Sequence, residues 1–322
     1  MNTMHLGFAV TVLGQPGLKS HDTRRWQNHP HLSVSLAYLR DIFVYLSRQN
    51  IHMYRMASDL APYVAHPEMP RFHTQIDECA AELAVTGEMA RSQELRLSFH
   101  PAPSNVLNAR DEAIARTSAQ QITAQARILE AMGLGREAVI VAHVGGVYGD
   151  KEAALRGFLE QYQHLPSPVR RRLAVENDDG RFSVGDIAQI HQESGIPLIF
   201  DYLHFHNNNP EKMHTMEALD LCLQSWPQGV KPKVHFSSPR TAIRVIERKG
   251  SKTGQKSRLL RAPRSVHHAD FIDPFQFISF VRAARRNNLP EFDVMLEAKA
   301  KDLTVLRLRQ NLGRFAPELV SD

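Results

Sequence analysis

Histidines and carboxylates follow short apolar runs along most of the chain. These residues are His100, His143, Glu176, Asp201, His204, His235 and Glu297. If the runs are parallel strands of one barrel, their carboxyl ends meet on one face and bring these side chains together. Imidazole and carboxylate without thiolate suit hard or borderline divalent ions at an open site. Because burying so many of these groups is costly unless cations compensate them, the pattern predicts a hydrolytic cluster of about two or three ions.

Eight strands are expected, because eight apolar runs alternate with helical patterns from end to end. The predicted strands are His5–Val12, Ile51–Met56, Leu95–Phe99, Ala138–His143, Arg172–Glu176, Pro197–Asp201, Lys233–Phe236 and Asp293–Glu297. Most are continuously apolar, as parallel strands buried on both faces are. Between them, Ser183 predicts a capped helix start and Gly195 a helix end. The alternation predicts a TIM (β/α)8 barrel, a single domain over residues 1–322, with a basic loop around 248–267 and a flexible tail over 311–322.

Two basic stretches indicate a polyanionic partner. The formal net charge is +5, and the segment Arg248–Arg264 holds no carboxylate. A second stretch, Lys19–Arg25, precedes Trp26 in the segment after the first predicted strand. Basic loops are often plain solvated surface, but both of these follow strands and should lie on the face where the metal residues gather. A nucleic acid is therefore favoured as the partner.

Other compositional features exclude several classes of protein. Cys79 and Cys222 are the only cysteines, which argues against a disulfide framework and for a reducing compartment. The start, Met1–Val10, has no long apolar stretch, and no run approaches the roughly 18 apolar residues of a membrane span. We expect a cytoplasmic protein with no membrane partner and no nucleotide cofactor.

Seven short blocks carry a resemblance to a known family. They are SFHP at Ser98–Pro101, HVGGVYGDK at His143–Lys151, VENDD at Val175–Asp179, FDYLH at Phe200–His204, PKVHFSSP at Pro232–Pro239, HHAD at His267–Asp270 and LEAKAKD at Leu296–Asp302. Together they resemble the UV-damage endonuclease family. The resemblance implies a metal-bearing TIM barrel, similar to that of apurinic endonucleases. It also implies nicking of DNA immediately 5′ of pyrimidine dimers and 6-4 products, leaving a 3′-hydroxyl and a 5′-phosphate. Manganese is the family's usual ion, with zinc, magnesium or cobalt as alternatives.

The resemblance also implies roles for individual residues. The metal ligands would be His100, His143, Glu176, Asp201, His204, His235, His268 and Glu297. Glu176 would bridge ions, and Lys233, a family position that can be carboxylated, would join Glu176, His235 and Glu297 as a catalytic residue. His267 competes with His268; the latter keeps the family's His-Ala-Asp spacing.

A further set of matched positions would meet DNA. These are Tyr54, Arg55, Gly146, Tyr148, Lys151, Asn177 and Lys299. Most of them have another interpretation. Tyr54 and Arg55 could pack against a loop, and Asn177 could orient the site. Gly146, Tyr148 and Lys151 could belong to an ordinary strand-to-helix turn.

One segment departs from the family pattern. After His-Pro the family places a glutamine and an aromatic residue that probe the duplex, whereas this chain has Ala102, Pro103 and Ser104. Pro103 cannot donate a backbone hydrogen bond and Ser104 has no ring to stack on a base. Lesion recognition is therefore expected to be weakened, moved or retargeted. Two rival interpretations are a metal-dependent sugar isomerase or epimerase on the same barrel, and a non-catalytic protein that binds damaged DNA.

Overall fold

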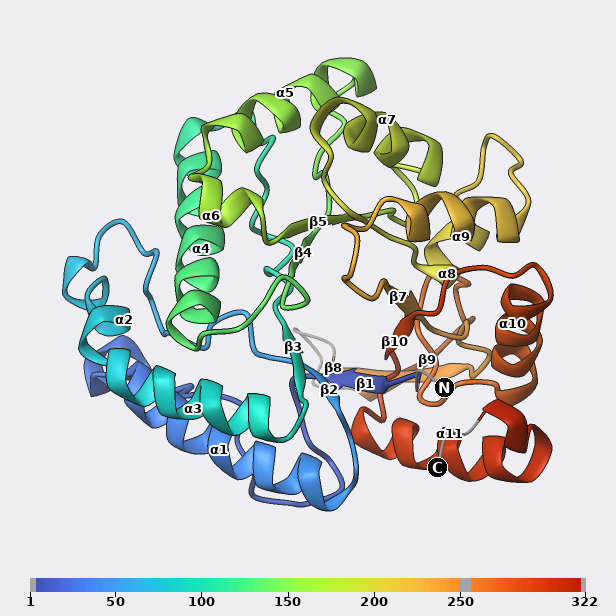
Figure 1. The fold of residues 1–322 in the computed structure, drawn as a ribbon, viewed down its shortest axis with the longest axis horizontal. Helices are drawn as coiled ribbons and strands as arrows, with labels where there is room; N and C mark the ends of the chain where they lie inside the picture. The colour runs from blue at the N-terminus through green and yellow to red at the C-terminus, as the bar shows by residue number, and fades with distance from the viewer. Residues whose placement is uncertain (1–3, 250–255, 320–322) are drawn as a thin grey trace.

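The fold is a closed barrel of eight parallel strands, as the sequence predicted. The computed structural model describes residues 4–249 and 256–319 (Figure 1). The barrel strands are β1 (Leu6–Ala9), β2 (Met53–Arg55), β3 (Arg96–Ser98), β4 (Ile140–Ala142), β5 (Leu173–Glu176), β6 (Leu198–Ile199), β7 (Lys233–Phe236) and β10 (Asp293–Leu296). They form sheets of order β3-β2-β1-β10-β7 and β4-β5-β6. Parallel bridges from Phe99 to Ile140 and from Asp201 to His235 join the two sheets and close the barrel.

The strands lie deep in the molecule, which explains their apolar composition. All four residues of β1, β5, β7 and β10 are buried. Phe8, Tyr54 and Phe236 fill the core. Gly7 lets β1 approach β2 closely, because a Cβ there would lie 2.6 Å from the carbonyl oxygen of Met53. The barrel interior is thus a packed core, which leaves the strand ends as the place for a site.

Helices surround the barrel. They are α1 (Leu32–Arg48), α2 (Gln75–Glu78), α3 (Ala80–Ser92), α4 (Glu112–Ala131), α5 (Lys151–His164), α6 (Ser167–Arg170), α7 (Val184–Ser194), α8 (Tyr202–Asn207), α9 (Thr215–Gln224), α10 (Pro274–Arg286) and α11 (Asp302–Phe315). Three short 3-10 helices, η1 (Trp26–Asn28), η2 (Pro70–Phe72) and η3 (Pro317–Leu319), lie in the connecting segments and near the C-terminus. As predicted, Ser183 caps α7 in a reciprocal box with Asp186, and Gly195 ends it with a left-handed φ of 72°.

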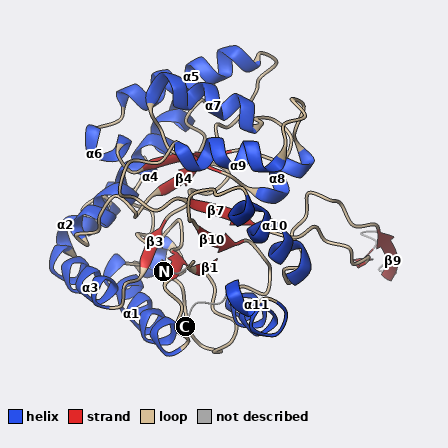
Figure 2. Ribbon diagram, turned by 45° about the vertical axis from the view of Figure 1, so that its right-hand side comes forward, coloured by secondary structure: helices blue, strands red, loops and turns tan. Residues whose placement is uncertain are grey.

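Two local predictions were wrong. The expected basic loop contains an antiparallel hairpin, β8 (Arg244–Lys249) paired with β9 (Lys256–Arg261), which projects from the barrel in Figure 2. A lysine-rich, glycine-containing sequence indicates a loop, but Val245 and Ile246 on one strand pair across the hairpin with Leu260 and Leu259 on the other. The expected flexible tail is helical to Phe315 and continues into η3. Leu312 and Leu319 are buried there, and apolar burial of that kind holds the segment against the barrel. Residues 250–255 and 320–322 of these two predictions lie outside the described part of the chain.

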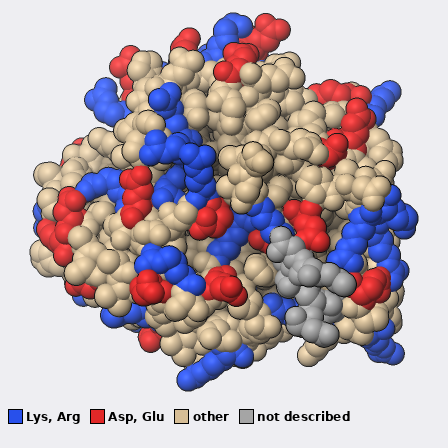
Figure 3. Space-filling model, in the orientation of Figure 1, with Lys and Arg blue, Asp and Glu red and all other residues tan. Residues whose placement is uncertain are grey.

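The opposite end of the barrel, where the strands begin, contains a charge network of its own. Arg96 Nη1 donates to Asp293 Oδ2 at 2.8 Å, and Lys231 Nζ lies 3.0 Å from Asp293 Oδ1. This end faces the viewer in Figure 1, and Figure 3 shows basic and acidic side chains interspersed over it. None of the described helices is both long and apolar enough to span a membrane.

Candidate metal centre

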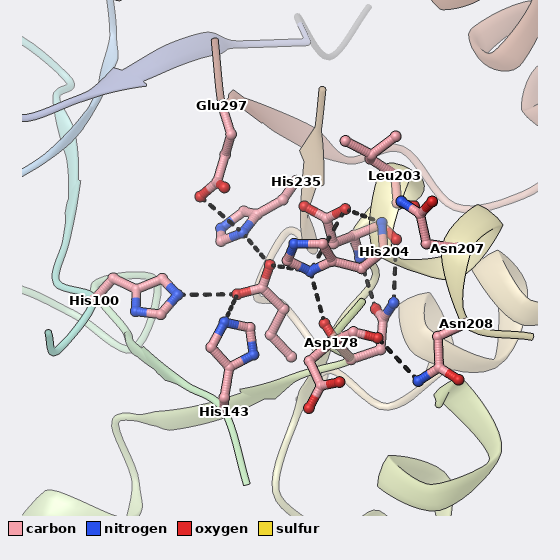
Figure 4. Close-up of polar contacts among 12 residues, drawn as sticks. His100, His143, Asp178, Leu203, His204, Asn207, Asn208, His235 and Glu297 are labelled. Atoms are coloured by element: carbon pink, nitrogen blue, oxygen red, sulfur yellow. Dashed lines mark hydrogen bonds and ion pairs between the residues drawn. The ribbon is translucent and has the colours of Figure 1, made fainter. Parts of the chain in front are cut away.

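Glu176 lies at the centre of a cluster of imidazoles. It is the last residue of β5, and its side chain is almost completely buried. Oε2 lies 3.1 Å from His100 Nε2 and 3.7 Å from His143 Nε2. Oε1 lies 2.8 Å from His235 Nδ1 and 3.7 Å from His204 Nδ1. Figure 4 shows the labelled rings of His100, His143, His204 and His235 pointing toward one another. The convergence predicted from sequence therefore does occur.

Two further carboxylates complete the cluster. Asp201 is fully buried, and its Oδ1 accepts a hydrogen bond of 2.8 Å from the backbone N–H of His204. Glu297 Oε1 lies 3.4 Å from His235 Nδ1, and Glu297 Oε2 lies 3.8 Å from His268 Nδ1. The structure therefore places His268, the preferred candidate, beside the cluster.

The donor atoms form three overlapping sets suited to metal ions. One set is His100, His143 and Glu176; a second is Glu176, Asp201 and His204; the third is Glu176, His235 and Glu297. Within each set the ligand atoms lie within 4.8 Å of one another, and Glu176 belongs to all three. Such sharing is what a carboxylate that bridges neighbouring ions requires.

Several buried donor atoms have no hydrogen-bond partner among the described residues. They include Asp201 Oδ2, His235 Nε2 and His143 Nδ1. A buried polar atom without a partner costs about 1–3 kcal/mol, so these atoms are unfavourable unless something else binds them. Oxygen and imidazole nitrogen are ligands for divalent ions, and the residues present therefore fit a metal cluster.

The electrostatics of the cluster also favour a cation. Burial raises the pKa of Asp201, and the nearby Glu176 and Glu297 raise it further. Burial alone would lower the pKa of His204, but Asp201, Glu176 and Glu297 raise it to about 9. Despite burial, the neighbouring imidazoles, His235 foremost, hold the pKa of Glu176 well below its usual value, and Arg55 lowers the pKa of Glu297, so both carboxylates are ionised. In the metal-free protein, protonated His204 supplies part of the positive charge that balances them. Divalent ions would displace that proton.

Lys233 sits beneath the cluster at the start of β7. It is almost completely buried, and its Nζ has no hydrogen-bond partner among the described residues. Burial lowers its pKa well below the usual value, and the positive charges of Arg96 and Arg55 lower it further. The neutral amine is therefore the favoured form at this position.

Two residues expected to meet DNA are placed elsewhere. Tyr54 is fully buried, and its hydroxyl donates to the carbonyl of Val10 at 2.6 Å. Asn177 is fully buried as well; its Oδ1 accepts from the Asp201 N–H at 2.8 Å and its Nδ2 donates to the Asp201 carbonyl at 3.2 Å. The structure contradicts DNA contact by either side chain. Tyr54 faces the core because strand residues alternate between faces, and Asn177 orients Asp201 instead.

The other expected DNA-contact residues lie around the cluster. Arg55 forms an ion pair with Glu297, so it sits inside the site. Lys151 begins α5 and pairs with Asp186 at 2.8 Å. Tyr148 is 39% exposed and Arg110 stacks over its ring. Lys299 lines a hollow beside Glu297.

Asn108 was missed by the sequence prediction. Its Oδ1 accepts from the N–H of Gly146 at 3.1 Å and its Nδ2 donates to the Gly146 carbonyl at 2.9 Å. Asn108 therefore fixes the backbone of Gly146, a residue expected to meet DNA, and its side chain already accepts from the Gly146 N–H. No pattern in the chain marks Asn108, because its partner is 38 residues away.

Two hollows flank the cluster on the strand-end face. The larger, of about 880 Å³, is lined by His100, His143, Tyr148 and Arg181 among others. The smaller, of about 380 Å³, is lined by Arg55, Glu297, Lys299 and Lys301 among others. Val266 and His268 line both hollows and so separate them. Arg181 and Lys301 were not among the predicted residues, although Lys301 lies within the LEAKAKD block.

Comparisons with known proteins identify the family. Residues 31–318 match the family model for UV-endonuclease UvdE. The chain belongs to this family. It is 31% identical over 270 residues to the UV DNA damage endonuclease of Bacillus velezensis, which covers 84% of this chain and 77% of that protein. Identity to the Bacillus mycoides UV DNA damage endonuclease is 33% over 269 residues, covering 83% and 77%. The crystal structure of SacUVDE superposes with a TM-score of 0.79 at 29% identity, covering 97% of this chain and 98% of that one.

More distant structures share the fold alone. D-psicose 3-epimerase from Clostridium cellulolyticum H10 has a TM-score of 0.55 at 9% identity, and covers 99% of this chain and 100% of its own. This likeness confirms the TIM-barrel architecture. At such low identity it carries no argument for sugar chemistry.

Proposed function

We propose that this UvdE-family protein is a metal-dependent endonuclease that acts on double-stranded DNA with distorting UV lesions. It would hydrolyse the phosphodiester immediately 5′ of pyrimidine dimers or 6-4 products and leave a 3′-hydroxyl and a 5′-phosphate. The observation that carries the proposal is the sharing of Glu176 by three sets of metal-ligand atoms at the mouth of the barrel. A DNA substrate also agrees with the expected cytoplasmic location.

The metal ligands of the proposal are the eight residues named from sequence, with Glu176 as the bridge. Divalent ions held there, manganese first among them, would stabilise the charge that develops during in-line displacement at phosphorus. Arg55 holds Glu297 through their ion pair, and Asn177 holds Asp201 through two hydrogen bonds. These contacts keep two carboxylates oriented toward the cluster.

Lys233 has a proposed role of its own. Its neutral amine can add carbon dioxide, forming a carbon–nitrogen bond and releasing one proton, which gives an anionic carbamate. The carbamate oxygens could then bind metal ions, which the buried amine in its unmodified form does not do. Intact-mass measurement of the native protein tests this step, and Lys233→Met is the control that cannot gain the mass.

The larger hollow suits the displaced nucleotides. Its volume of about 880 Å³ lies within the range of about 300–1,000 Å³ typical of ligand pockets. Displacing a base costs a few kcal/mol, and less at a weakened stack, so the step itself favours damaged sites. The hollow adjoins His100 and His143, which places the reacting phosphate near the cluster.

A cleavage assay on defined duplexes tests the proposal. End-labelled duplexes carrying a dimer, a 6-4 product, an abasic site or no lesion are incubated with manganese, and the product ends are mapped. We expect a nick 5′ of the photolesion, and none with Glu176→Gln. Tight binding of lesioned duplexes without strand breaks would favour a non-catalytic binder and contradict the proposal.

A further inference from the structure

The β8–β9 hairpin is the largest feature that the barrel chemistry does not use. It is inserted between two candidate ligands, His235 within β7 and His268 before α10. Its root is tied directly to the cluster: Pro239 forms an antiparallel bridge with His268, and the N–H of Arg240 donates to the His267 carbonyl at 2.7 Å. The arm therefore rises from the ridge that separates the two hollows.

The charge of the arm matches a polyanion. Residues 244–261 contain seven lysines and arginines and one glutamate. The single acid, Glu247, pairs with Arg258 at 3.2 Å. Figure 2 shows β9 standing clear of the rest of the fold, so the backbone of this strand does not pack on the barrel.

The arm also carries aliphatic side chains that nothing in the described structure covers. Ile243, Val245, Leu259 and Leu260 are 64%, 58%, 48% and 69% exposed. Val245 lies directly opposite Leu260 in the register, next to the Glu247–Arg258 pair on the same face. A two-stranded ribbon stands alone only marginally in water, and exposing its apolar residues makes it less favourable still.

Basic and aliphatic residues together suit a DNA groove. A two-stranded ribbon fits a groove of the duplex, where basic residues meet phosphates and aliphatic residues wedge between base steps. Ala102, Pro103 and Ser104, which stand where the family's probe residues were expected, offer neither an aromatic ring nor a long aliphatic side chain beside the larger hollow. The arm is the neighbouring element that supplies such side chains.

We propose that the β8–β9 hairpin is a DNA-binding arm that enters a groove of the duplex beside the cluster, with Val245 and Leu260 as a wedge that favours distorted base steps. This inference deepens the proposed function and rests on it for the identity of the duplex. The arm thus takes over lesion discrimination from the segment after His100.

Duplex binding by the full-length protein tests the wedge. Fluorescence anisotropy is measured with EDTA, which prevents cleavage, on a duplex with one pyrimidine dimer and on the same duplex without it. Val245→Ser with Leu260→Ser should weaken binding to the lesioned duplex about tenfold, and binding to the plain duplex far less. Val85→Ser is the matched control, because Val85 is 57% exposed on α3, away from the arm.

Charge variants test the groove contact separately. Arg258→Gln with Arg261→Gln should weaken binding to both duplexes and reduce the slope of log affinity against log salt by about 2. Glu247→Gln should strengthen binding to both. The unfolding temperature of each variant should match that of the parent, because the substituted side chains do not pack against the barrel.

Three results would overturn the inference. If the serine variant loses equal affinity for both duplexes, Val245 and Leu260 do not act as a wedge. If all variants bind both duplexes as the parent does, the arm does not contact DNA. If sedimentation shows that the parent is a dimer and the serine variant a monomer, a second copy of the chain covers the aliphatic pair. Because these readouts need no cleavage, they can fail while the parent still nicks lesioned DNA, and the reverse also holds.

Discussion

Replacing Glu176 should reduce activity more than replacing any other carboxylate of the cluster, with little effect on the fold. Glu176→Gln keeps the shape of the side chain and removes its charge. Glu176 belongs to all three sets of candidate ligands, whereas Asp201 and Glu297 belong to one set each. Loss of one group that stabilises a transition state typically costs about 10²–10³ in kcat. Because all three sets would be affected, we expect a loss of at least about 10³.

Metal content provides the second readout. Purified Glu176→Gln protein should retain the fold by circular dichroism but lose manganese from every set. Asp201→Asn and Glu297→Gln serve as matched controls, and each should lose only part of the metal. Near-parental turnover, or full metal content in Glu176→Gln, would refute the bridging role and the reasoning from shared ligand atoms.

Three further predictions test other parts of the site. The metal-free protein should lose about 3 kcal/mol of unfolding free energy as pH rises from 6.5 through about 9, because folding raises the pKa of His204 to about 9. Urea titrations at several pH values measure this loss. The variant His204→Gln should show little of it. Tyr54→Phe should cost about 1 kcal/mol, from the lost bond to Val10, and leave DNA affinity unchanged in an anisotropy titration. Pro103→Gln with Ser104→Tyr should raise the ratio of lesioned to plain duplex cleaved; an unchanged ratio would place recognition outside this segment.

The cluster was predictable because its ligands follow strands. Each strand is a continuous apolar run, and the residue after it, such as His100 or His143, lies on the shared face whatever the neighbouring loops do. The family blocks then singled out His268, which follows a segment with no strand signal. Its distance from Glu297 depends on the hairpin root, which the sequence did not reveal.

The errors have a common physical origin. Tyr54 and Arg55 are adjacent, and each side chain ends in a polar group. The Tyr54 side chain nevertheless lies in the core, whereas Arg55 forms an ion pair with Glu297. Strand residues alternate between faces, so a shift of one residue decides which side chain is available. The sequence analysis missed the hairpin because lysine and glycine are typical of loops. It missed the end of the C-terminal helix because chain ends are commonly flexible.

The sequence by itself determined the barrel, the imidazole and carboxylate chemistry and the membership of the UvdE family, because these depend on residue type and on order along the chain. Only the tertiary structure decided that Glu176 is shared by all three ligand sets, that Asn108 and Asn177 position their neighbours, and that an exposed basic arm stands at the edge of the cluster. Those properties depend on distances between residues far apart in sequence, and such distances arise only when the strands close into a barrel.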